Sequence, residues 1–141
     1  MEKKAIYLTL KANEKFFVNG AVLRSDRKVT LELLNDANFL LENHVIQADE
    51  TNTPLKQLYF AGQLILMDSL AAGQASEVFC QLLQELRQVL KDPQILEGLA
   101  KCATLYEQGR LFHILKLLRG LFSHEAKIME RLASTFNAVA E

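Results

Sequence analysis

Residues 51–67, TNTPLKQLYFAGQLILM, mark the point where the pattern of the chain changes from strand-like to helical, so they separate two structural halves. Thr53 followed by Pro54 predicts a helix start, since a hydroxyl side chain caps the first turn and proline fits the first helical position. The apolar residues that follow cover nearly the whole circumference of a helix, which is typical of a helix packed on more than one side. Gly62 interrupts this pattern and costs about 1 kcal/mol against alanine unless another backbone approaches closely.

The sequence before this helix predicts four or five short antiparallel strands. Residues 6–10 and 29–34 have strand-like alternation or β-prone composition, and residues 39–46 close this half. Asn19-Gly20 separates two apolar runs and predicts a hairpin, because a type I′ turn requires positive φ at both central residues. A sheet of so few strands buries little apolar surface by itself. We therefore expect the following helix to cover it.

After residue 67 the apolar residues recur at helical spacing. Residues 75–90 carry the clearest stripe, and Asp92-Pro93 begins a second segment that Gly109 ends. A last segment runs from residue 110 into the 130s, and the short links favour antiparallel neighbours.

These patterns together predict an α+β fold in one folding unit. A small N-terminal antiparallel β-sheet, residues 1–48, is expected to pack on a C-terminal four-helix region, residues 49–141. The first helix should lie against the sheet.

Composition is that of a globular domain with its own core: 141 residues, of which 50% are apolar and 23% charged. No apolar run approaches the roughly 18 residues of a membrane span, and the first one is too short for a signal peptide. Cys80 and Cys102 fall on apolar helical stripes without CxxC spacing, which favours buried reduced thiols over a disulfide. These features predict a cytoplasmic protein with no membrane contact.

The sequence contains no pattern of catalytic or metal-ligating residues. His44, His113 and His124 have no metal-site spacing with the cysteines, and eleven helical residues would separate the last two histidines by roughly 16 Å. Nucleotide-binding and nucleophile motifs are absent. Asp49-Glu50 lie just before a helix start, where acids favour the helix dipole. We therefore expect a non-enzyme with no catalytic residue, metal or cofactor.

Charge is distributed unevenly although the net charge is only −1. Residues 1–30 hold seven basic and three acidic side chains, and the remainder holds nine basic and fourteen acidic ones. A basic head on an acidic body is consistent with an anionic partner, and equally with an ordinary solvated surface.

Several short motifs follow one another in a fixed order between residues 14 and 63: Glu14, Asn19-Gly20-Ala21, Thr53-Pro54, Tyr59 and Gln63. Together they resemble the FlbT family of bacterial flagellin regulators. One departure is Asn13, where the family usually has glycine; asparagine also tolerates left-handed backbone, so the turn is expected to survive. The first strands are also similar to the strand–Gly-Glu–strand opening of the carbon-storage regulator, a small β protein that binds messenger leaders.

The FlbT resemblance implies a post-transcriptional regulator in flagellum biogenesis. Such a protein binds the 5′ untranslated leader of flagellin mRNA and represses its translation or promotes its decay, alongside a second regulator, FlaF. Phosphate binding requires Lys and Arg, so the candidate RNA-binding residues are those of the basic head: Lys11, Lys15, Arg24, Arg27 and Lys28. Phe16 and Phe17 point to opposite faces of one strand, so one could stack on a base, although core or dimer contact is the commoner fate.

A protein-binding adaptor or chaperone-like module is the alternative, gripping flagellin or a FlaF-type regulator and acting on RNA indirectly. Its candidate surface is a polar-to-basic stripe on the last helix, for which an ordinary solvated face is the plainer explanation. That stripe comprises His113, Lys116, Ser123, Lys127 and Arg131. Open strand edges in a small sheet also predict a homodimer or larger homo-oligomer formed through the β half.

Overall fold

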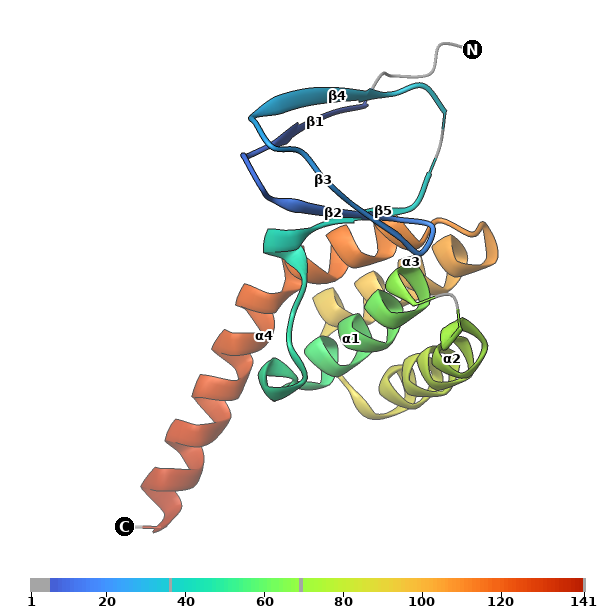
Figure 1. The fold of residues 1–141 in the computed structure, drawn as a ribbon. Coiled ribbons are helices and arrows are strands. Elements are labelled where there is room, and N and C mark those ends of the chain that lie inside the picture. Colours follow the sequence, from blue (N-terminus) through green and yellow to red (C-terminus); the bar gives the residue numbers. More distant parts are fainter. Residues whose placement is uncertain (1–5, 36, 69, 141) are drawn as a thin grey trace.

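A computed structural model describes residues 6–35, 37–68 and 70–140, with side chains up to residue 137. Five strands come first: β1 (Ile6–Leu10), β2 (Lys15–Val18), β3 (Ala21–Arg24), β4 (Val29–Leu33) and β5 (Phe39–Leu41). Two single-turn helices follow, η1 (Glu42–His44) and η2 (Ala48–Glu50). Four α-helices complete the fold: α1 (Pro54–Met67), α2 (Ala72–Val89), α3 (Pro93–Glu107) and α4 (Leu111–Ala140). The predicted α+β class is confirmed, and Figure 1 shows the strands gathered at one end of the helices.

The strands form two antiparallel sheets where a single sheet is predicted. β1 pairs with β4, and the second sheet has the order β3-β2-β5. The β2–β3 hairpin is confirmed, with φ of 49° at Asn19 and 81° at Gly20. The last strand is shorter than predicted because the chain leaves the sheet in a 3₁₀ turn at Glu42.

Adjacent phenylalanines on β2 enter two different cores. Phe16 packs with Leu8 and Leu10 of β1 in a small cluster between the two sheets. Phe17 packs with Leu40 of β5 in the larger cluster that the four helices share. Both rings are at least nine-tenths buried. Neither is therefore exposed for stacking on a base, and the core alternative holds for both.

The helix α1 joins the two halves, as the sequence predicts. Its cap is confirmed, since the Thr53 hydroxyl accepts the N–H of Lys56 at 3.3 Å. It packs against β2, β5, α2 and α4. The buried amide of Gln63 donates to the carbonyl of Ile46 and accepts its N–H, both at 2.8 Å. These two bonds hold the segment between β5 and α1 against the helix.

Close contact between α1 and α4 explains the glycine in the first helix. A Cβ at Gly62 would lie 3.0 Å from Cδ2 of Leu115 on α4, so the approach is made by a side chain of α4. Near the start of α1, Oε2 of the buried Glu125 accepts the N–H of Leu55 at 2.9 Å. The C-terminal end of α4 projects past the other helices (Figure 1), and residues 129–137 are all exposed.

The two cysteines differ in burial, which corrects one prediction. Both are free, but only Cys102 is buried, whereas Cys80 is exposed. The reason is the rotation of α2: Ala75, Phe79 and Leu83 face the core, and Cys80 lies about 100° around the helix from Phe79. In the described part of the chain no helix is long and apolar enough to cross a membrane.

Candidate functional site

The structure brings the five predicted basic residues to one end of the two sheets, where all are exposed. Lys11 lies on the turn between β1 and β2, and Arg27 and Lys28 lie on the adjoining turn between β3 and β4, while Lys15 begins β2 and Arg24 ends β3 beside these turns. The Asn13 N–H of the first turn donates to the Ser25 carbonyl of the second at 2.7 Å. Asn13 has a φ of 64°, the left-handed backbone expected there. We call this group the basic turns: Lys11, Lys15, Arg24, Arg27 and Lys28.

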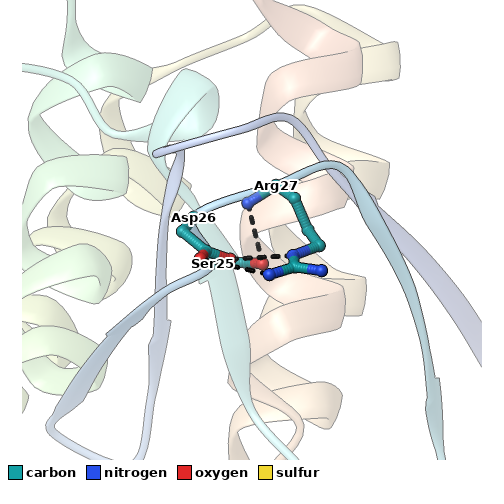
Figure 2. Close-up of polar contacts among 3 residues, drawn as sticks. All are labelled: Ser25, Asp26 and Arg27. Atoms are coloured by element: carbon teal, nitrogen blue, oxygen red, sulfur yellow. Dashed lines mark hydrogen bonds and ion pairs between the residues drawn. The ribbon is translucent and has the colours of Figure 1, made fainter.

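One of these bases already has an acidic neighbour. Arg27 Nε lies 3.1 Å from Asp26 Oδ1, and the two side chains are 78% and 79% exposed (Figure 2). The backbone N–H of Arg27 donates to Ser25 Oγ at 3.3 Å and shapes the turn. Ion pairs exposed to this degree contribute little to stability. The Arg27 guanidinium can therefore exchange Asp26 for a phosphate at small cost.

Two further carboxylates lie among the basic turns and serve the backbone. Glu14 Oε1 accepts the N–H of Lys11 at 3.1 Å, and Glu42 Oε2 accepts the N–H of Lys15 at 2.7 Å. Together with Asp26 they partly offset the positive charge. Since the remaining excess is modest, charge alone gives this end of the molecule only a weak attraction for anions.

Beside the basic turns a hollow of about 490 Å³ opens between β3 and β4. Its sides come from both sheets, and one side is polar. We call it the strand hollow; it is lined by Leu10, Phe16, Leu23, Arg24, Ser25, Asp26, Val29 and Leu31.

The strand hollow exists because β3 and β4 do not pair with each other. Leu23 lies opposite Phe16, and Leu31 lies opposite Leu8, so both leucines share the inward faces of their sheets. They are nevertheless 47% and 38% exposed. Strand alternation would assign both to the core, so sequence reasoning missed them. Only the missing pairing between the two sheets exposes them.

Arg119 of α4 is a second feature that the sequence did not reveal. This half-buried guanidinium donates to the Tyr59 hydroxyl at 3.0 Å, and that hydroxyl donates to the His44 carbonyl at 2.6 Å. Burial raises the pKa of Tyr59, so its hydroxyl stays protonated. Burial and then the charge of Arg119 lower the pKa of His44, while Glu14 opposes the shift. The cluster locks η1 to α1 and α4.

The alternative surface on α4 is only partly as predicted. Lys116, Ser123, Lys127 and Arg131 are exposed, whereas His113 is partly buried with its ring 5.2 Å from that of Phe112. On the projecting end of α4, three apolar side chains are 42%, 61% and 78% exposed: Met129, Leu132 and Phe136. Within the described residues, no group of three or more His, Cys, Asp and Glu side chains is placed to hold a metal ion.

Comparison with known proteins gives a consistent result. The sequence model of a family described as flagellar protein FlbT matches residues 6–129. Relatives from Brucella anthropi, Brucella abortus and Brucella ovis are each named probable flagellum biosynthesis repressor protein FlbT. Each is 50% identical over 127 residues, which cover 90% of this chain and 84% of the relative. No solved structure matches the chain.

Proposed function

The chain belongs to the FlbT family of flagellar proteins, and from that premise we propose that it represses flagellum biosynthesis after transcription. It binds the 5′ untranslated leader of flagellin mRNA in the cytoplasm and represses translation or promotes decay of the message. The observation that carries this proposal is the gathering of the basic turns, whose five exposed side chains come from separate parts of the sequence.

The geometry of the basic turns suits a flexible phosphate backbone. Lys15 and Arg24 are direct cross-strand neighbours, and the hydrogen bond from Asn13 to Ser25 keeps the two turns adjacent. Exposed Lys and Arg side chains on turns reach phosphates without disturbing a core. The three carboxylates nearby limit non-specific attraction, so the shape of the RNA and its bases should contribute to recognition.

The test is a salt titration of leader binding with Arg24, Arg27 and Lys28 changed together to Glu. Each phosphate contact adds about 0.7 to the slope of log affinity against log salt for a single strand. We expect the triple variant to lose affinity by orders of magnitude and to show a shallower slope. Helix content and melting temperature should stay nearly unchanged, because all three side chains are exposed.

The matched control reverses three exposed bases on α4: Lys116→Glu, Lys127→Glu and Arg131→Glu. It changes the net charge by the same amount on a different element of the fold. If this variant loses as much affinity for the leader as the first one does, the affinity depends on overall charge and not on the basic turns. A wild-type protein that binds no leader RNA would contradict the proposal.

The adaptor remains a second candidate because of the projecting end of α4. Exposed apolar side chains at Leu132 and Phe136 are suited to a protein contact, with flagellin or a FlaF-type regulator as the partner that the family resemblance suggests. Tight, salt-insensitive association with flagellin that survives the first triple variant would favour this candidate. We also propose that the chain forms a homodimer or larger homo-oligomer through its β half.

A further inference from the structure

The strand hollow is open to solvent although most of its lining is apolar, like the lining of a protein core. Leu23 and Leu31 face the space between the sheets, yet each keeps more than a third of its surface in contact with solvent. Below them, Leu10 and Phe16 form a buried apolar floor. A volume of about 490 Å³ lies within the roughly 300–1,000 Å³ range of sites for small molecules.

One side of the hollow carries charged and hydroxyl groups instead of apolar side chains. It is formed by Arg24, Ser25 and Asp26, which belong to or adjoin the basic turns. A nucleobase has two apolar faces and a polar edge, and proteins hold unstacked bases between apolar side chains while polar groups contact the edge. The walls and the polar side of the hollow match those two requirements.

We propose that the strand hollow receives one unstacked base of the bound RNA, while the basic turns hold the flanking phosphates. This inference rests on the proposed function and specifies how the same surface recognises its ligand. The Asp26 carboxylate accepts hydrogen bonds, so it favours a base whose edge carries an exocyclic amino group, as adenine, cytosine and guanine do, over uracil, whose edge offers N3–H alone between two carbonyl acceptors. When Arg27 turns from Asp26 to a phosphate, both carboxylate oxygens become free for the base.

Positive charge beside the opening favours RNA over other occupants. Arg24 lines the hollow, and its cross-strand neighbour Lys15 and the nearby Lys28 are exposed around it. A second copy of the chain would bring the same positive charge to the same place, which opposes association there.

The experiment compares Leu23→Gln with Val22→Gln. Both positions lie on β3 and are about half exposed, but Val22 lies opposite Phe17 on the other face and does not line the hollow. Binding is measured to a leader oligonucleotide, to an abasic ribose–phosphate oligomer of the same length, and to oligouridine. Leu31→Gln provides a second variant on the facing strand.

We expect Leu23→Gln to weaken leader binding on the order of tenfold, the scale of losing contact with one base. Its salt slope and its affinity for the abasic oligomer should stay at the wild-type values, because the phosphate contacts remain. Val22→Gln should match the wild type throughout. Asp26→Asn should reduce the preference for the leader over oligouridine.

Different results separate this inference from the proposed function. If the wild type binds the leader with a salt dependence but Leu23→Gln and Leu31→Gln bind as tightly as Val22→Gln, the base site is wrong and RNA binding stands. If the wild type binds neither the leader nor the abasic oligomer, the proposed function is wrong as well. If Leu23→Gln instead lowers the molar mass in light scattering, a second copy closes the hollow and the base site is overturned.

Discussion

At the scale of single residues, Cys80 and Cys102 both fall on apolar helical stripes in the sequence but differ in burial in the structure. The thiol of Cys102 is fully buried among the helices, and burial raises its pKa to about 12. Cys80 lies at the surface of α2. Only a thiolate reacts as a nucleophile, so the two cysteines should differ strongly in reactivity.

We therefore expect iodoacetamide at about pH 8 to modify Cys80 in the folded protein and to leave Cys102 unmodified. The carbamidomethylated peptides are quantified by mass spectrometry. In denaturant both thiols should react, because burial is lost. Equal labelling of the two cysteines in the folded protein would contradict the burial of Cys102.

His44 should make the stability of the protein depend on pH. Burial and then Arg119 lower its pKa below the usual 6.5, so the unfolded chain binds the proton more readily than the folded one. The stabilising contribution is complete above the unfolded pKa and is lost as pH falls through the folded pKa. Between about pH 7.5 and 5.5, urea denaturation should show a steeper loss of stability for the wild type than for His44→Gln. Parallel profiles would show that His44 does not titrate in this way.

At the scale of secondary structure, the packing of α4 determines whether a Cβ can be added at Gly120 on α4 and at Gly98 on α3. No heavy atom lies within 4 Å of a Cβ placed on Gly120, which is exposed on α4. On α3, a Cβ at Gly98 would lie 2.5 Å from Cδ1 of the buried Leu121 and 3.3 Å from Cδ2 of Leu117. The same substitution should thus have opposite effects at the two positions.

We expect Gly120→Ala to raise the free energy of unfolding by about 0.5–1 kcal/mol, the gain in helix propensity. Gly98→Ala should lower the free energy of unfolding, because the inserted methyl group forces Leu121 out of its packed position. Overpacking of this kind costs about 1–3 kcal/mol, and the gain in helix propensity offsets part of that cost. Urea denaturation measures both values. A stabilised Gly98→Ala protein would indicate that α3 and α4 are packed less closely than described.

At the scale of the whole molecule, the β half is incompletely covered. The sheet of β1 and β4 has only two strands, and such pairs are marginal in water without further packing. Its outer face carries Tyr7, which is 64% exposed, and Leu34 just beyond β4 is 85% exposed. Tyr7 and the inward-facing Leu8 alternate, so a partner on the outer face would leave the strand hollow open.

This arrangement predicts a homodimer or larger assembly through the β1–β4 sheet, since a second copy would add strands or cover the exposed face. Light scattering at tens of micromolar should give at least twice the monomer mass. Tyr7→Ser should shift the equilibrium toward the monomer, because it removes the largest exposed side chain of that face. A monomeric wild type at that concentration would contradict the prediction.

The predicted features that are confirmed are those with local causes. The caps at Thr53 and Asp92 and the hairpin at Asn19-Gly20 depend on residues only a few positions apart. The same holds for the change from strands to helices near residue 53. Family membership also follows from the order of short motifs such as that at Gln63, whose role in holding Ile46 emerges only in the fold.

Local patterns along the chain were therefore enough to predict the α+β class, the order of strands and α-helices, and the family. The separation into two sheets, the exposure of Cys80 and the gathering of the basic turns follow instead from the way the elements pack. So does the position of Leu23 and Leu31 in the lining of an open hollow. The physical reason is that propensities and caps act over a few residues, whereas the pairing of strand edges depends on contacts between segments far apart in the chain.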